Sequence, residues 1–234
     1  MTAHDHAEYL RKAQQAGLKV FGKQSWALYV QAPFEAVPSQ GAADIVEAYA
    51  QARRLLNSFD EALQRCAATL QPQGIRARMR PGGIKDANRT IEKMSGRQKT
   101  LPLDLLGGTL ICPSLEATYA AAGEVMHQFD VVSFRDRCIT PVPSGYRDLQ
   151  LSVRLADGHL AELKIMHQVI SDLDQYEHRI FEIQRRIEAE HRAEMPFVEE
   201  LVAKSLTAAS EAMYAQAWVR VLVMEGLLDD EEKG

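Results

Sequence analysis

The sequence lacks the features that would place the chain in a membrane or in an oxidising compartment. No apolar run approaches the roughly 20 residues that a membrane-spanning helix needs, and the first residues, MTAHDHAEYLRKAQQ, contain no signal-peptide core. There are only three cysteines, Cys66, Cys112 and Cys138, and they form no Cys-x-x-Cys pair. They are expected to be reduced thiols, and neither a disulfide framework nor a zinc site is indicated. We therefore expect a cytoplasmic protein without membrane association.

Internal repeats and low-complexity linkers are also absent. The 234 residues, 46% hydrophobic and 25% charged, have the composition of a globular protein that can bury a substantial core. The net charge of −5 is unevenly distributed: residues 75–99 hold eight lysines and arginines against two acidic residues, so that this segment is +6 and the rest of the chain −11. Positive charge concentrated in one segment is typical of a focused anion-binding site.

Residues 144–167 predict a β-hairpin with one apolar and one polar face. Hydrophobic and polar residues alternate through both halves, as in half-buried strands, and Asp157-Gly158 supplies the turn. The apolar face would consist of Leu149, Leu151, Val153, Leu155, Ala161, Leu163 and Ile165. The other face would carry Gln150, Ser152, Arg154, Glu162 and Lys164, with Tyr146 entering on the same side. This polar face is either a site or an ordinary solvated surface.

The length of the hairpin loop follows from burial. A shift of one residue moves every side chain to the opposite face, so a two-residue turn would place charges in the apolar face. A three-residue loop over residues 156–158, with its glycine in the left-handed conformation, instead pairs Ser152 with Glu162 and Gln150 with Lys164. We expect the second register.

The basic segment predicts a strand followed by a helix. Residues 75–80 alternate like a strand, the following Pro-Gly-Gly should break it, and Asp86 should cap a helix that ends near Ser95-Gly96. Lys85, Arg89 and Lys93 recur every four residues and can line one side of this helix. A solvated charged helix is the alternative interpretation.

Helical periodicity is predicted on both sides of this region. Residues 42–70 indicate one long helix or a pair, residues 114–129 a helix before a strand at 131–134, and the chain after His167 is again helical. Residues 21–37 suggest an irregular docking segment. The order of strands and helices suits an α+β fold with a mixed sheet of about five strands flanked by helices.

The hairpin resembles part of a known family. Gly145-Tyr-Arg-Asp-Leu149 and Glu162-Leu-Lys-Ile165 are similar to two strands of the RelA/SpoT-type synthetase domain, which transfers pyrophosphate from ATP to the 3′ hydroxyl of a guanosine nucleotide. The spacing of Lys85, Arg89 and Lys93 resembles the family's donor-nucleotide element. Leu103-Asp104-Leu-Leu resembles its aspartate-leucine-leucine-glycine strand entry.

The resemblance covers roughly residues 75–186 and implies a nucleotidyltransferase-like fold. We expect a helical N-terminal segment over residues 1–73, a synthetase core over 74–186 and a C-terminal helical extension over 187–234, all in one compact unit. Because the family's hydrolase and regulatory domains have no counterpart here, the chain is similar to stand-alone small alarmone synthetases. It is also similar to versions found in bacterial polymorphic toxins.

The resemblance implies roles for individual residues. Lys85, Arg89 and Lys93 would bind the phosphates of ATP, and Asp104 and Glu162 would be catalytic and hold Mg²⁺, Glu162 orienting or deprotonating the acceptor hydroxyl. The acceptor, a purine nucleotide, would be bound by Tyr146, Arg147, Gln150 and Lys164. Further candidates are Arg80, Arg135, Arg137 and His167. Asp104 and Glu162 are expected to lie across one cleft.

Some positions depart from the family pattern. The family's arginine two residues before the first lysine, here Lys85, is replaced by Gly83. Near the acceptor, Val142, Ser144 and Gln150 replace a lysine, an asparagine and a histidine of the family. Two alternatives therefore remain: a toxin that pyrophosphorylates tRNA 3′ ends, and a non-catalytic nucleotide-binding or interaction module. A tRNA partner is less expected because the chain lacks a broad basic surface. An antitoxin or immunity protein and a homo-oligomer are further partners to test.

Overall fold

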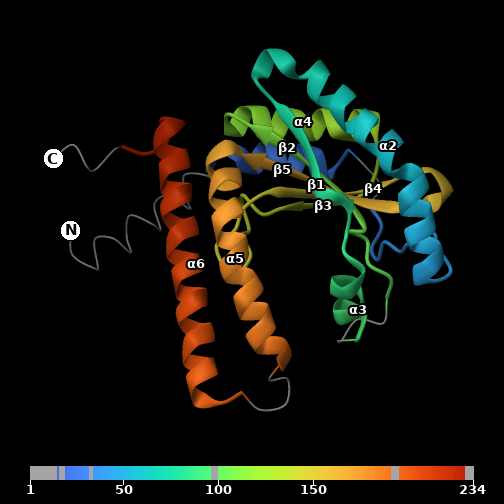
Figure 1. The fold of residues 1–234 in the computed structure, drawn as a ribbon. Helices are drawn as coiled ribbons and strands as arrows, with labels where there is room; N and C mark the ends of the chain where they lie inside the picture. The colour runs from blue at the N-terminus through green and yellow to red at the C-terminus, as the bar shows by residue number, and fades with distance from the viewer. Residues whose placement is uncertain (1–14, 16–18, 32–33, 96–99, 191–194, 230–234) are drawn as a thin grey trace. The chain divides into compact units, whose positions relative to one another are not determined.

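The computed structural model describes residues 15, 19–31, 34–95, 100–190 and 195–229. Its sheet has five strands in the order β1-β2-β5-β4-β3 and is mixed, as predicted (Figure 1). The strands are β1 (Arg76–Ile84), β2 (Leu106–Cys112), β3 (Asp130–Asp136), β4 (Leu149–Arg154) and β5 (Leu160–His167). The helices are α2 (Ile45–Thr69), α3 (Ala87–Ser95), α4 (Leu115–Gln128), α5 (Gln168–Glu190) and α6 (Phe197–Met224). The predicted α+β class is thus confirmed.

The chain divides into two compact units, which are described separately. Among the described residues, the first unit, the sheet unit, lies within Gln24–Asp136 and Leu149–Met166, and the second, the helical unit, lies within Met1–Lys23, Arg137–Asp148 and His167–Gly234. In the sheet unit α2 packs on β1 and β2, and in the helical unit α5 packs on α6. The boundaries predicted at 73/74 and 186/187 stay a prediction. The expectation of a single compact unit stays a prediction.

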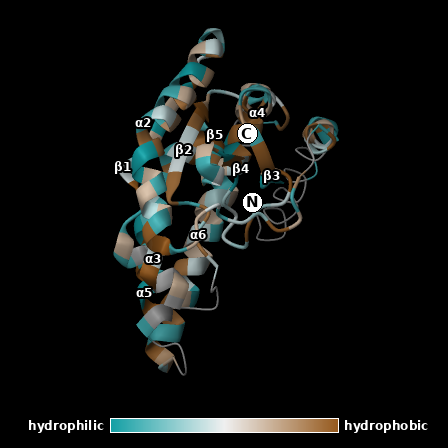
Figure 2. Ribbon diagram, turned by 90° about the vertical axis from the view of Figure 1, so that its right-hand side faces the viewer, coloured by the Kyte–Doolittle hydropathy of each residue, from teal (hydrophilic) through white to brown (hydrophobic). Residues whose placement is uncertain are grey.

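One face of the sheet is covered by α2 and α4, which contact each other. The sequence was compatible with one helix or two before residue 70, and the structure has one continuous helix, α2. Asp44 is its N-cap and accepts a hydrogen bond from the Glu47 amide at 2.8 Å. Figure 2 shows hydrophilic and hydrophobic residues alternating along α2. Its buried residues include Phe59 and Leu63, and a Cβ on Gly108 of β2 would lie 2.5 Å from Leu63 Cδ2. The missing side chain therefore lets α2 approach the sheet closely.

The hairpin of β4 and β5 confirms the predicted register. Ser152 pairs with Glu162 and Gln150 with Lys164 across a loop at residues 156–158. The alternating residues from Leu149 to Val153 and from Ala161 to Ile165 are fully buried on the helix-covered face, whereas Leu155 is only half-buried. Both Asp157 and Gly158 have positive φ, at 59° and 72°. The polar side chains are thereby directed to the sheet's other face.

Two segments differ from expectation. The strand β1 continues through residues 81–83, where the Pro-Gly-Gly sequence makes an irregularity in the register instead of ending the strand. Residues 21–29, expected to be irregular, are helical, and the described chain after residue 31 is irregular up to the start of α2. Part of it runs along the edge strand, where the Glu35 amide donates to the Val132 carbonyl at 2.8 Å.

In the helical unit, α5 and α6 lie side by side (Figure 1). The fully buried Tyr214 of α6 donates from its hydroxyl to Glu177 at 3.1 Å and to Asp174 at 3.2 Å, and Ser210 also donates to Glu177, at 2.7 Å. Because each polar group has a partner, the interface tolerates these carboxylates. Over the described part of the chain, no helix has the length and apolarity to span a membrane.

Candidate functional site

A cavity of about 700 Å³ lies in the sheet unit, within the size range of ligand pockets. It is lined by the polar face of the sheet, by the irregular segment at residues 34–40 and by residues 100–104 ahead of β2. The strand residues that line it are Ser133, Phe134, Arg135, Gln150, Ser152 and Glu162. Glu162 and Asp104 both line this cavity, as the sequence predicted.

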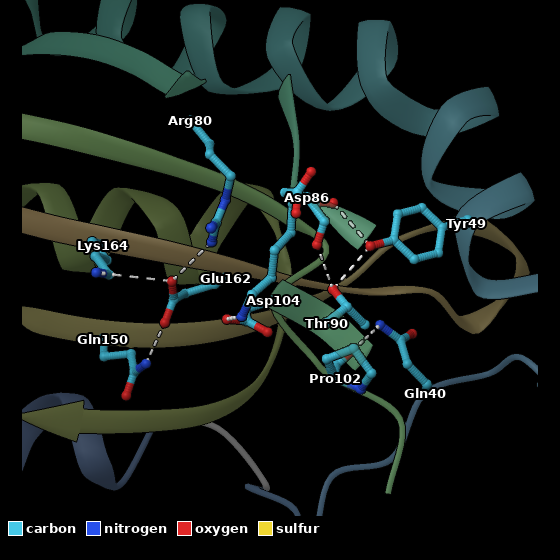
Figure 3. Close-up of polar contacts among 11 residues, drawn as sticks. Gln40, Tyr49, Arg80, Asp86, Thr90, Pro102, Asp104, Gln150, Glu162 and Lys164 are labelled. Carbon is cyan, nitrogen blue, oxygen red and sulfur yellow. Dashed lines mark hydrogen bonds and ion pairs between the residues drawn. The ribbon is translucent and has the colours of Figure 1, made fainter. Parts of the chain in front are cut away.

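Glu162 points to the polar face, and its side chain is 15% exposed. Gln150 Nε2 donates to Glu162 Oε1 at 2.5 Å, while Arg80 Nη2 and Lys164 Nζ lie 3.6 and 4.0 Å from Oε2 (Figure 3). Both carboxylate oxygens are thus engaged, which fixes the rotation of the group. The predicted sharing of one face by Glu162, Gln150 and Lys164 is confirmed.

Arg80 reaches Glu162 from β1 by crossing β2, the strand between them. It can do so because residue 107 is glycine: a Cβ there would lie 3.0 Å from Arg80 Nη2 and 3.1 Å from Nε. Gly107 therefore makes room for a guanidinium on the polar face, whereas Gly108 makes room for α2 on the opposite face. No sequence pattern indicated this role for the two glycines.

Asp104 precedes β2 and is paired with Lys85. The Lys85 Nζ lies 2.5 Å from Asp104 Oδ2, and the two side chains are 11% and 20% exposed. The backbone amide of Lys85 also donates to the Leu105 carbonyl at 2.9 Å. The first cation of the predicted donor element is therefore held directly against the predicted metal-binding carboxylate.

The start of α3 is fixed by short-range and long-range hydrogen bonds. Asp86 caps the helix as predicted, accepting from the Asn88 amide at 2.9 Å. The Tyr49 hydroxyl of α2 donates to the Lys85 carbonyl and to Thr90 Oγ1, both at 2.9 Å (Figure 3). Tyr49, which the sequence placed only in a core stripe, thus positions Lys85. The side chains of Arg89 and Lys93, also in α3, lie outside the described residues.

Gln40 joins the two chain segments that carry the carboxylates. Its Nε2 donates to the Pro102 carbonyl at 3.1 Å and to the Leu160 carbonyl at 2.9 Å, and its Oε1 accepts from the Leu160 amide at 2.7 Å. Pro102 and Leu160 each stand two residues before an acid, Asp104 and Glu162 respectively. Because the segment around Gln40 is irregular, sequence periodicity did not single it out.

Two of the predicted acceptor-binding residues belong to the helical unit, where they are buried. The Tyr146 hydroxyl donates to Asp148 Oδ2 at 2.9 Å, and its ring lies edge-to-face with Tyr214 at 5.5 Å between centroids. Arg147 donates to the Cys138 carbonyl, and its guanidinium lies 4.3 Å from the centre of the Trp218 ring. Their role in acceptor binding stays a prediction.

The further candidates are divided between the units. In the helical unit, Arg137 pairs with the buried Asp148 at 3.4 Å, and His167 Nε2 lies 3.6 Å from Glu225. In the sheet unit, Arg80 contacts Glu162 as described above, and Arg135 is exposed at the cavity wall. The structure therefore brings Arg80 and Arg135 to the cavity that the two acids line.

Burial shifts the pKa values of three titratable groups that are not part of the Asp104 and Glu162 site. The three cysteines are free and buried, and burial raises the pKa of Cys66 to about 11 and that of Cys112 to about 12, which agrees with protonated thiols. His159 is fully buried beside Gln51, and burial lowers its pKa to about 4. This histidine is therefore neutral at pH 7.

The donor set at the cavity suits a hard cation only in part. In the described ranges, no three His, Cys, Asp or Glu side chains come together as metal ligands. Asp104 and Glu162 nevertheless offer two carboxylates at one cavity, and Mg²⁺ is usually bound by one or two carboxylates together with water and substrate phosphates. Binding of Mg²⁺ stays a prediction, and the two carboxylates fit it.

Comparisons with solved structures confirm the predicted synthetase fold. Small alarmone synthetase 1 from Bacillus subtilis, bound to its product pppGpp, has a TM-score of 0.52 and 20% identity, over 74% of this chain and 92% of that one. The protein smu.1046c from Streptococcus mutans has a TM-score of 0.51 and 18% identity, over 77% and 92%. A GTP pyrophosphokinase family protein from Streptococcus pneumoniae has a TM-score of 0.50 and 15% identity, over 81% of this chain and 100% of that one. No family profile and no curated protein matches the sequence.

Proposed function

We propose that this chain transfers pyrophosphate from ATP to the 3′ hydroxyl of a purine nucleotide. The observation that carries the proposal is the placement of Asp104 and Glu162 at one cavity, each beside a cation, on a fold shared with small alarmone synthetases. One of those synthetases is bound to its product pppGpp. That product is a purine nucleotide, which supports the same substrate class here.

In the proposed reaction, Glu162 accepts the proton of the acceptor's 3′ hydroxyl. The hydroxyl oxygen attacks the β-phosphorus of ATP, the bond from that phosphorus to the α–β bridging oxygen breaks, and AMP leaves. Gln150 holds one carboxylate oxygen, and Arg80 and Lys164 face the other, so that the base is oriented before the substrate binds. Such positioning supplies most of the catalysis of phosphoryl transfer.

The cations ahead of and within α3 would bind the donor. Lys85 stands beside Asp104, and Arg89 and Lys93 follow it at helical spacing. Mg²⁺, when bound by Asp104 and Glu162, would neutralise charge on the phosphates. Because Lys85 already pairs with Asp104, donor binding would exchange part of this pair for contacts with phosphate.

The proposal is tested by incubating the full chain with ATP, Mg²⁺ and one acceptor at a time, followed by anion-exchange chromatography. The acceptors are GDP, GTP, ADP and tRNA. A new purine nucleotide together with AMP is the expected result. Transfer of pyrophosphate to tRNA alone, or no product with any acceptor, would contradict the proposal. A toxin role and an immunity partner stay predictions that growth assays can address.

A further inference from the structure

The cavity has an aromatic end that the proposed transfer chemistry does not use. Tyr29 and Phe34 line it, and Tyr29 remains 42% exposed. Their ring centroids are 5.8 Å apart, and the Tyr29 ring lies 5.1 Å from that of Phe134, both in edge-to-face arrangements. The Tyr29 hydroxyl donates to the Phe134 carbonyl at 3.1 Å. These contacts hold the two rings at the edge strand.

The pairing of the strands gives the backbone distance from this end of the cavity to Glu162. Ser133 of β3 pairs with Ser152 of β4, which pairs with Glu162 of β5. Neighbouring strands lie about 4.8 Å apart, so the row spans about 10 Å. That length suits a nucleoside whose base lies at the β3 edge and whose ribose lies toward Glu162.

A positive charge lies beside the β3 end of this row. Arg135 stands two residues after Ser133 on β3, pairs in register with Gln150, and lines the cavity with an exposed side chain. It makes no ion pair with any residue in the described ranges. By contrast, Arg80 and Lys85 are already paired with carboxylates. Arg135 is therefore available to bind an anionic group of a ligand.

We propose that Tyr29 and Phe34 form a subsite for the base of the acceptor nucleotide, with Arg135 binding its 5′ phosphates. The assignment rests on the proposed function and gives base recognition to residues of the N-terminal segment in place of Tyr146, whose hydroxyl is engaged by Asp148 and whose ring packs on Tyr214. Aromatic side chains stack on nucleobases, and a purine offers more ring area than a pyrimidine. The ligand class is thus a purine nucleoside 5′-diphosphate or triphosphate.

The test is calorimetric binding of GDP, ADP and ribose 5-phosphate to the full chain and its variants. Tyr29→Leu removes the ring and should weaken binding of the purine nucleotide that the wild type prefers by roughly ten- to a hundredfold. Ribose 5-phosphate, which has no base, should bind as it does to the wild type. Tyr29→Phe keeps the ring and should bind the nucleotide nearly normally.

Trp26→Leu is the matched control. Trp26 belongs to the same helical stretch and is 69% exposed, but it does not line the cavity, so nucleotide binding should be unchanged. Arg135→Ala should weaken binding of GDP or ADP more than that of the parent nucleoside. If Tyr29→Leu fails to fold, as judged by circular dichroism, Phe34→Leu takes its place in the comparison.

Binding of GDP and ADP with wild-type affinity by a folded Tyr29→Leu would overturn the subsite. This result is separable from failure of the proposed function, because binding is measured without turnover. If no acceptor yields product but Tyr29→Leu loses nucleotide affinity, the subsite stands and the transfer proposal fails. If product forms and Tyr29→Leu changes neither affinity nor acceptor KM, the subsite alone fails.

Discussion

At the scale of the residue, Glu162 carries the most specific chemical prediction. Glu162→Gln preserves shape and the face on which the side chain lies, but the amide cannot accept the hydroxyl proton. We expect the rate of transfer to fall by roughly 10²–10⁴-fold, the usual contribution of a general base. Thermal unfolding should change little, because the group is partly exposed and the substitution removes no volume. Initial rates and a circular dichroism melt measure both.

Glu35→Gln provides the control for this prediction. Glu35 lines the same cavity and pairs with Arg154, as Glu162 pairs with Arg80, but the proposal gives it no part in proton transfer. Its variant should keep transfer within about twofold, since exposed ion pairs contribute little. Equal losses in the two variants would mean that cavity charge, and not a base at Glu162, supports the reaction.

At the scale of the element, the irregular segment at residues 34–40 holds the site together through Gln40. Gln40→Ala removes the three hydrogen bonds that tie Pro102 to Leu160. Since misplacement by about 1 Å can cost a hundredfold in rate, we expect kcat to fall roughly ten- to a hundredfold with little change in nucleotide KM. Steady-state kinetics with saturating ATP separates the two parameters.

Gln51→Ala controls for the loss of a buried glutamine near the same strand. Gln51 contacts His159, the neighbour of Leu160, from α2, and among the described residues it has no hydrogen bond to the segment that carries Asp104. Gln51→Ala should lower thermal stability at least as much as Gln40→Ala does, while its kcat stays near that of the wild type. A kcat loss that simply follows stability in both variants would refute the positioning role of Gln40.

The elements also show where sequence reasoning works. The register of β4 and β5 could be predicted because alternation over a few neighbouring residues determines which face is buried. The contacts of Gln40 could not, since it bonds to Leu160 across 120 positions of sequence and has no periodic pattern. The burial of Tyr146 against Tyr214 could not be predicted either, because a local motif does not reveal which distant helix covers it.

At the scale of the whole molecule, stability should depend on pH through a neutral histidine at the hairpin loop. His159 is fully buried, its Nδ1 is 3.2 Å from Gln51 Oε1, and its Nε2 has no hydrogen-bond partner among the described residues. Burial lowers its pKa from 6.5 to about 4. The unfolded chain therefore binds a proton more readily than the folded chain between these two values, so the free energy of unfolding rises with pH in this window.

We expect this contribution to be complete above about pH 6.5 and to be lost progressively as the pH falls toward 4, by on the order of 3 kcal/mol. His159→Asn keeps a donor near Gln51 but cannot be protonated, so its unfolding free energy should change less between pH 7.5 and pH 5 than that of the wild type. Urea titrations followed by circular dichroism measure the difference. His127→Asn, which changes an exposed histidine on α4, should keep the wild-type pH dependence. If His159→Asn also keeps that dependence, His159 is already protonated in the folded chain or is accessible to water, and the pH sensitivity must come from the carboxylates.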